Sequence, residues 1–215
     1  MQVVICAPMQ QTVTSILRHF LVSAFVISGI YGGNPLAQEW PSELPRKPKA
    51  QAIRVPEQSI LVDGDLGDEI WQTVAPESDL HEFKPTPFAP PRQRTEVRFA
   101  YDDRALYIGA RMWDTAPDSI LHQLIQRDGG GNTDVFGIWF SCFDDGVNGV
   151  RFSVTPDGVQ SDELLTSDGS DGSWNAVWKS ECRIDQDGWT AEFALPWSVF
   201  RFSDKGDEEQ EWGMN

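Results

Sequence analysis

Short stretches of alternating apolar and polar residues dominate most of this 215-residue chain. In the clearest one, Thr95–Tyr101, every second residue is large and apolar, which puts these side chains on one face of an extended strand. Comparable stretches follow at a spacing of roughly 8–12 residues, separated by turns rich in Asp and Gly. They are Leu106–Met112, Val135–Phe143, Val150–Thr155, Val177–Ile184 and Trp189–Leu195. This pattern predicts an all-β fold, a jelly-roll-like antiparallel β-sandwich.

Helix signals are few. Asp68–Ala75 fits a short helix, because Ile70 and Val74 are four residues apart and acidic residues stand at its start. Pro196–Phe200 predicts one helical turn. We therefore expect one or two short helices beside the sandwich, and the lack of an evident internal repeat argues against a propeller or a solenoid.

The first 37 residues differ from the rest of the chain. They hold a single Arg, Arg18, no acidic residue, and the 12-residue apolar stretch Phe20–Tyr31. Such a stretch is shorter than the roughly 20 residues of a membrane-spanning helix and is typical of a secretory signal. We expect residues 1–37 to be a signal peptide that directs the chain to the periplasm, the outer membrane or the exterior; a buried helix is the alternative. Residues 38–58, rich in Pro and Lys, are expected to be a linker.

The net charge limits the possible binding partners, and the cysteine content leaves open whether a disulfide forms. The net charge is −16, which disfavours nucleic acid and anionic membrane surfaces as partners. Cys142 and Cys182 both lie in strand-like stretches. In an oxidising compartment they could pair, and two separate buried thiols are the alternative.

Four motifs, in this order and spacing, resemble the family 9 carbohydrate-binding module, a β-sandwich found in xylanases. The resemblance is strongest to the version at the amino terminus of large bacterial secreted or outer-membrane proteins. It covers residues 59–215 and implies that this domain binds sugar and holds calcium. The motifs are Leu61–Trp71 (LVDGDLGDEIW), Val97–Asp114 (VRFAYDDRALYIGARMWD), Arg127–Gln160 and Gly188–Asn215.

Modules of this family grip the end of a sugar chain between two tryptophans, and the resemblance transfers this site only in part. Arg151 falls where the family has a sugar-contacting Arg, and Ser153 falls where it has an Asn. Gly131 stands at the position of the first clamping Trp, and Gly137 stands at that of a sugar-contacting acid. The second clamping Trp comes after the strand that begins at Trp212–Asn215 (WGMN), and the chain stops at Asn215. The resemblance thus implies two unfilled clamp positions and a domain truncated at its carboxyl end, the front of a longer protein.

Tryptophan rings that stack on the apolar faces of sugars are the other candidates for binding. Trp174 lies in a loop of acidic residues and glycines. Trp113 stands at the end of one predicted strand, and Trp139 lies within another. Packing in the core is the alternative for each of the three. The remaining mature-chain tryptophans in strand or helix patterns are expected in the core.

Calcium would need six to eight oxygen ligands, mostly from carboxylates and carbonyls. Asp114, Asp128 and Asp134 bracket one predicted loop, and Asp134 also matches an Asp of the family. The resemblance implies a structural Ca²⁺ at these three residues. Ordinary solvated turns are the alternative.

The sequence contains no recognisable catalytic motif: GxSxG, HExxH and CxxC are all absent. The favoured interpretation is an exported, non-catalytic module that binds polysaccharide or oligosaccharide, the amino-terminal part of a larger envelope protein acting in carbohydrate catabolism. The second interpretation is a structural or interaction domain of a periplasmic or outer-membrane protein, with no sugar site. The third is a glycoside hydrolase acting on O-glycosyl bonds, for which no catalytic residues are predicted.

Overall fold

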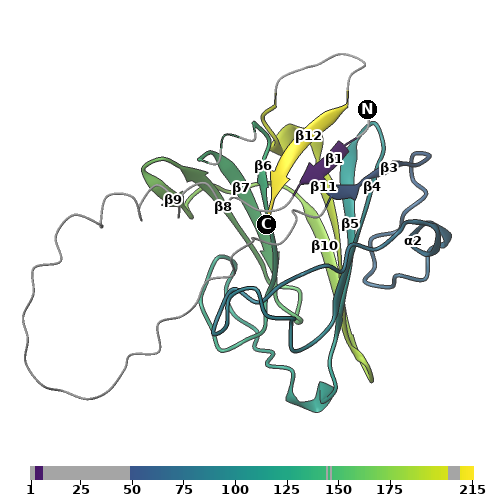
Figure 1. Ribbon diagram of the computed structural model, residues 1–215, viewed down its shortest axis with the longest axis vertical. Helices are drawn as coiled ribbons and strands as arrows, with labels where there is room; N and C mark the ends of the chain where they lie inside the picture. The colour runs from purple at the N-terminus through teal and green to yellow at the C-terminus, as the bar shows by residue number, and fades with distance from the viewer. Residues whose placement is uncertain (1–2, 7–48, 144, 146, 203–208) are drawn as a thin grey trace, which may run out of the picture.

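The protein is a sandwich of two β-sheets in a computed structural model that describes residues 3–6, 49–143, 145, 147–202 and 209–215 (Figure 1). We call the two sheets the β7 sheet and the β5 sheet. The β7 sheet has the order β2-β1-β12-β6-β7-β8-β9, and the β5 sheet has the order β10-β11-β5-β4-β3. Two of the strand pairs, β1–β12 and β3–β4, are parallel, and the others are antiparallel. The predicted all-β sandwich is confirmed.

The six predicted strand stretches each contain a strand: β4, β5, β6, β7, β10 and β11. The strands of the β7 sheet are β1 (Val3–Cys6), β2 (Lys49–Gln51), β6 (Phe136–Ser141), β7 (Gly149–Val154), β8 (Gln160–Thr166), β9 (Gly169–Asp171) and β12 (Gln210–Met214). Those of the β5 sheet are β3 (Ile53–Arg54), β4 (Thr95–Tyr101), β5 (Ala105–Trp113), β10 (Lys179–Asp185) and β11 (Gly188–Pro196). The helical elements are α2 (Glu69–Thr73) and the 3-10 turns η1 (Pro117–Ser119) and η2 (Trp197–Val199).

Alternation decides which side chains form the core between the sheets. Phe99 and Phe193 on the β5 sheet, and Phe140 and Phe152 on the β7 sheet, are all buried inside the sandwich. Phe152 also meets Trp178 edge-on, with ring centroids 5.3 Å apart. Each of these aromatic side chains removes a large apolar area from water, so their packing stabilises the sandwich.

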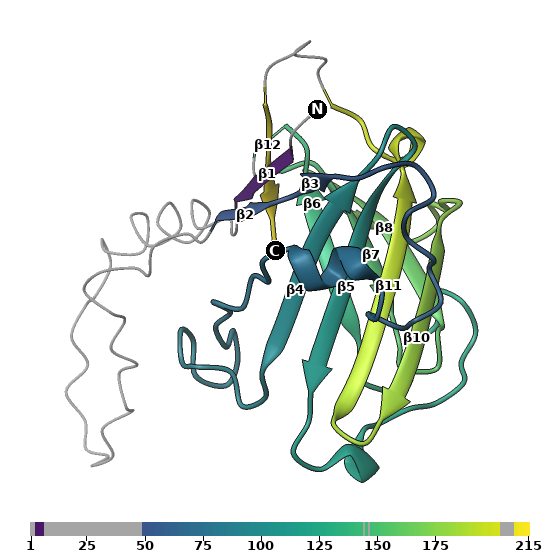
Figure 2. The same ribbon diagram turned by 90° about the vertical axis from the view of Figure 1, so that its right-hand side faces the viewer.

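A second, smaller core lies on the outside of the β5 sheet, where α2 crosses the strands (Figure 2). Trp71 of α2 is 1% exposed and its indole packs over Gly109, where a Cβ would lie 3.1 Å from the ring. Its Nε1 donates to Oε1 of Glu192 at 2.7 Å, and the backbone N–H groups of Asp63 and Gly64 donate to Oε2. Burial raises the pKa of the Glu192 carboxyl above its ordinary value of 4.5, although its three N–H donors act in the opposite direction.

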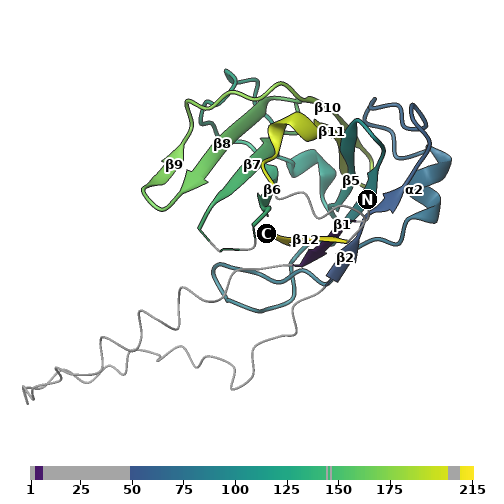
Figure 3. The same cartoon turned by 90° about the horizontal axis from the view of Figure 1, so that it is seen from above.

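Some elements differ from what the sequence indicates. The residues SILVDG at Ser59–Gly64 are typical of a strand that runs into a turn, but this segment is irregular and leads to α2. Strands β8 and β9 were not predicted, because polar residues occupy both faces of β8. Figure 3 shows both strands extending the β7 sheet at the side far from α2.

Cys142 and Cys182 are free thiols, in agreement with the alternative of two separate thiols. Cys182 belongs to β10, in the β5 sheet, and Cys142 follows β6, in the other sheet. Both are partly buried, and burial raises the pKa of each thiol to about 12. Neither is therefore a thiolate near neutral pH.

The predicted signal peptide and linker are described only at their ends. Residues 3–6 form β1, which pairs with β2 and β12, and residues 49–58 include β2 and β3. Residues 7–48 lie outside the described residues, so the signal peptide and the linker stay predictions. Within the part of the chain that the structure describes, no helix has the length and apolar character needed to span a membrane.

Candidate functional site: a polar hollow on the outer face of the β7 sheet

Three neighbouring strands, β6, β7 and β8, place polar side chains on the outer face of the β7 sheet. Arg151 lies opposite Trp139 on one side and Glu163 on the other. In the next row, Ser153 lies between Gly137 and Ser161. The intervening residues of β6 and β7 point into the core, so the residues of the two rows lie together on the outer face.

The polar groups of these two rows are already paired within the face. Arg151 Nη1 donates to Glu163 Oε1 at 2.8 Å, with side-chain exposures of 46% and 24%. The Ser153 hydroxyl donates to the Ser161 carbonyl at 3.4 Å. Gly137 lets Ser153 pack close against β6, since a Cβ at Gly137 would lie only 3.1 Å from Ser153 Cβ. The arrangement holds a donor and an acceptor side by side at the surface.

A solvent-open hollow of about 310 Å³ lies over these residues. Its floor includes Arg151, Ser153, Ser161 and Glu163, and its wall is the loop that precedes β6. The wall contributes Ile125, Asp128, Gly129, Gly130, Gly131, Thr133 and Val135.

Buried ionic and hydrogen bonds fix this wall to β8. Arg127 of the loop forms an ion pair with Asp162, whose side chain is completely buried. Asp162 also accepts from the backbone N–H of Ala176 at 2.6 Å and from Trp178 Nε1 at 3.2 Å. Asp128, next to Arg127, accepts from the backbone N–H of Asp162 at 3.0 Å. A buried charge with this many partners holds the loop in one position relative to the floor.

The structure brings two of the predicted binding residues, Arg151 and Ser153, into this hollow. Trp139 is their neighbour in the sheet, but its half-buried indole packs over Gly149, where a Cβ would lie 2.1 Å from Nε1. That Nε1 is buried and has no hydrogen-bond partner among the described residues. Trp139 therefore adjoins the hollow rather than lining it.

The other two predicted tryptophans, Trp174 and Trp113, do not line the hollow. Trp174 packs against the core ring of Phe152, with centroids 5.9 Å apart, and lines a separate cavity of about 370 Å³ with Val150. It reaches the inner side of the β7 sheet, whereas Arg151 is on the outer side. Trp113 is at the end of β5, in the other sheet. Their loop or strand-end positions did not reveal which face they serve.

The three predicted calcium ligands are not gathered into one site. Among the described residues, no group of three or more His, Cys, Asp or Glu side chains could hold a metal ion. Asp114 accepts from the backbone N–H of Ala116, Asp128 accepts from that of Asp162, and Asp134 accepts from that of Leu121. These residues as arranged do not fit a calcium ion, and calcium binding stays a prediction from the resemblance.

Two residues of the hollow, Ser161 and Glu163, were missed by sequence reasoning. They alternate with Asp162 and Leu164 along β8, so a period of two was present in the sequence. The alternation of β8 was hard to recognise because its buried, inward-facing residue is Asp162, which is charged. A charged side chain is rarely buried unless it has partners that balance the charge.

The comparisons with known proteins bear on the fold. No protein-family model matches the chain, and no curated protein matches it. A solved structure from Bacteroides uniformis, of a protein proposed to bind carbohydrate, has a TM-score of 0.54 at 12% identity, covering 72% of this chain and 75% of that one. The two chains share a fold.

Two structures of a family 9 carbohydrate-binding module from Caldicellulosiruptor kristjanssonii also match. The structure with glucose has a TM-score of 0.49 at 16% identity, covering 72% of both chains. The structure with cellotriose has a TM-score of 0.47 at 18% identity, covering 72% of this chain and 69% of that one.

Proposed function

We propose that this domain binds a neutral saccharide in the hollow on the outer face of the β7 sheet and does not cleave it. The observation that carries the proposal is the solvent-exposed Arg151–Glu163 pair, set beside Ser153 and Ser161. A sugar hydroxyl both donates and accepts, so a guanidinium and a carboxylate held side by side satisfy both of its needs.

The charges around the hollow favour a neutral ligand over an acidic one. Arg151 lines it together with the carboxylates of Asp128 and Glu163. The carboxylate of Asp162 is buried and paired with Arg127, so the exposed lining is slightly negative. A uronic acid or a sulfated sugar would meet repulsion here, whereas a neutral sugar would not.

The same geometry supports binding rather than hydrolysis. Glycosidases use two carboxyl groups, one on each side of the scissile bond. In the hollow, Asp162 is completely buried and hydrogen-bonded, and Glu163 is paired with Arg151. Asp128 accepts from a backbone N–H. None of the three is free to act as the acid of such a pair.

The shared fold with a protein that is proposed to bind carbohydrate supports this function. Export, and attachment to a larger envelope protein, belong to the same proposal. They rest on the charge-poor, apolar start of the sequence and on the motif resemblance.

The direct test is isothermal titration calorimetry of the wild-type domain with cellotriose, xylotriose and chitotriose. We expect at least one of these sugars to bind, and we expect Arg151→Ala and Glu163→Gln each to weaken binding by about tenfold, or about 1.4 kcal/mol. Both side chains belong to a surface ion pair, so unfolding should change by less than about 1 kcal/mol.

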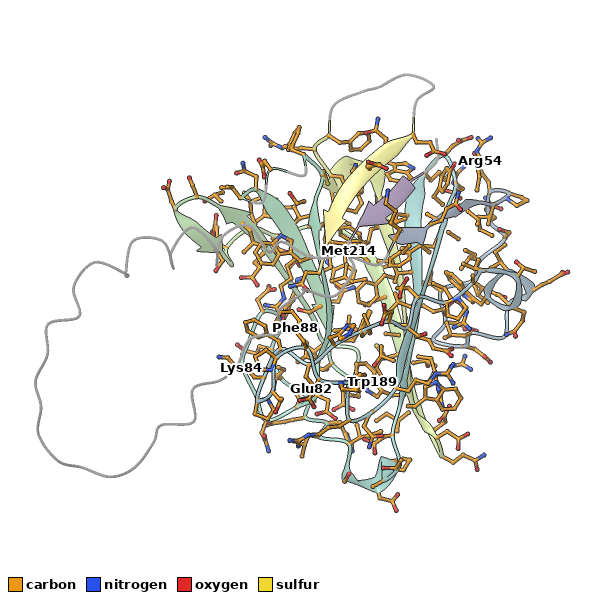
Figure 4. The ribbon with its side chains drawn as sticks, in the orientation of Figure 1. Arg54, Glu82, Lys84, Phe88, Trp189 and Met214 are labelled. Carbon is orange, nitrogen blue, oxygen red and sulfur yellow. The ribbon has the colours of Figure 1, made fainter. Side chains whose placement is uncertain are left out.

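Arg54→Ala is the matched control. Arg54 forms an exposed ion pair with Asp103 at the upper end of the sandwich in Figure 4 and does not line the hollow. It should leave binding unchanged. No binding of any neutral saccharide by the wild-type domain would overturn the proposal in favour of an interaction domain without a sugar site.

A further inference from the structure

The outer face of the β5 sheet is covered only in part. In Figure 2, α2 crosses the middle of the sheet, and the ends of β4, β5, β10 and β11 run on below it. A cavity of about 580 Å³ lies along this uncovered part, walled by Gly67 and Gln72 on the side of α2. We call this cavity the Trp113 groove.

Strand register builds the floor of the Trp113 groove. Glu96 of β4 lies opposite Arg111 of β5, which lies opposite Thr190 of β11, which lies opposite Arg183 of β10. These four residues come from four adjacent strands, so they form one row across the sheet. A row of this kind is rigid because every strand in it is hydrogen-bonded to its neighbours.

Trp113 lies two residues beyond Arg111 on β5, beside this row, and is 36% exposed. The guanidinium of Arg111 stacks over its ring at 4.5 Å from the centroid. Arg111 in turn donates to both carboxylate oxygens of Asp185, at 2.5 and 2.7 Å. The ring is thus held in place by a cation–π contact that is itself fixed by a two-point ion pair.

Other ion pairs hold the remaining charges of the groove. Glu96 is paired with Arg98 at 3.1 Å, and Arg183 is paired with Asp65 at 3.0 Å. Three guanidinium groups and three carboxylates therefore line the groove. They are Arg98, Arg111, Arg183, Asp65, Glu96 and Asp185. An equal number of both signs suits a neutral ligand rich in hydroxyl groups better than an anion.

We propose that the Trp113 groove is a second saccharide-binding site, so that the domain binds two sugar chains. A partly exposed indole beside fixed donors and acceptors is the combination that stacks on the apolar face of a sugar and meets its hydroxyls. This inference rests on the proposed function, but uses a different sheet and different residues. It also gives the exposed position of Trp113 a role.

The two sites face opposite sides of the sandwich. The hollow lies outside the β7 sheet and the Trp113 groove lies outside the β5 sheet. Two separate polysaccharide chains can therefore occupy the domain at once. On a matrix that presents many chains, bivalent binding of this kind increases the overall affinity without any new contact.

Titration calorimetry with the same three neutral trisaccharides counts the sites. We expect two binding events for the wild-type domain. Arg151→Ala should weaken one of them about tenfold and leave the other unchanged, Trp113→Ala should weaken the other, and the double variant should weaken both. Trp113→Tyr keeps an aromatic ring and should retain the second site. Phe83→Ala is the matched control, because Phe83 is an aromatic residue with 80% exposure that lines neither the hollow nor the groove.

Each outcome decides between the two proposals. If Arg151→Ala abolishes all binding and Trp113→Ala changes none, the groove is not a site and the proposed function stands. If Trp113→Ala alone abolishes binding, the groove is supported and the hollow is not. Where Trp113→Ala fails to fold by circular dichroism, Gln72→Trp fills the groove from α2 and should remove the same site. If no sugar binds the wild-type domain, both proposals fail.

Discussion

The indole of Trp71 and the carboxylate of Glu192, 121 residues apart, meet in a hydrogen bond of 2.7 Å on the outside of the β5 sheet. Glu192 is completely buried there, and its other oxygen accepts two backbone N–H groups from the segment that leads to α2. This one carboxylate therefore attaches the helix and its preceding loop to the sheet.

Glu192→Gln should destabilise the fold by about 3 kcal/mol. The amide group of Gln replaces one acceptor with a donor, which then faces an N–H group in a buried site. Urea unfolding measures the effect. Glu181→Gln is the control, since Glu181 lies opposite Glu192 in the register but is exposed, and it should change stability by less than about 0.5 kcal/mol. Equal effects of the two variants would contradict this role.

Stability should fall in acid through Asp185. The hydrogen bonds from Arg111 hold the pKa of Asp185 below its ordinary value of 3.8 in the folded chain. A lowered folded pKa means that the contribution is present above 3.8 and is lost as the pH falls through the folded value. Melting temperatures of the wild type and Asp185→Asn should therefore converge as the pH falls from 6 toward the folded pKa. A constant difference across that range would rule the pair out as a source of acid sensitivity.

Asp162→Ala should cost about 3–5 kcal/mol of unfolding free energy, because it leaves the guanidinium of Arg127 and two buried N–H donors without their acceptor. It should also weaken saccharide binding in the hollow, since the wall is no longer fixed to β8. Chemical denaturation and calorimetry measure the two effects. Asp168→Ala, in the exposed turn between β8 and β9, should alter neither; loss of stability in that control would point to a general charge effect.

Removal of residues 1–37, the predicted signal peptide, should expose an edge of the β7 sheet. β1 lies within that segment and pairs with β12 from Gln210 to Gly213. Without it, backbone N–H and C=O groups of β12 lose their partners, and an open edge of this kind pairs readily with another chain. We expect residues 38–215 to melt at a lower temperature than residues 1–215 and to self-associate with increasing concentration in sedimentation velocity. A stable monomer with an unchanged melting temperature would show that β12 needs no such partner.

Much of the fold could be predicted from the sequence because a strand has a period of two that any reader can find. Thr95–Tyr101 shows it fully, and β4 has those bounds. Polar and apolar residues there separate onto two faces, and the apolar face packs into the core between the sheets. β8 has acidic and hydroxyl residues on both faces, and it was missed for that reason. Its inward residue Asp162 is stable only because Arg127 and Trp178 meet it in space.

The sequence by itself determined that stretches of alternating apolar and polar residues form strands, that turns separate these strands, and that Arg151 points away from the core. These are local properties, set by backbone geometry and side-chain polarity. The tertiary structure alone decided which outward-facing residues meet. It paired Arg151 with Glu163 and placed Trp174 on the inner side of the same sheet. It also brought Arg111 to Asp185, 74 residues away, because strand order and register, which no local pattern encodes, set the distances between side chains.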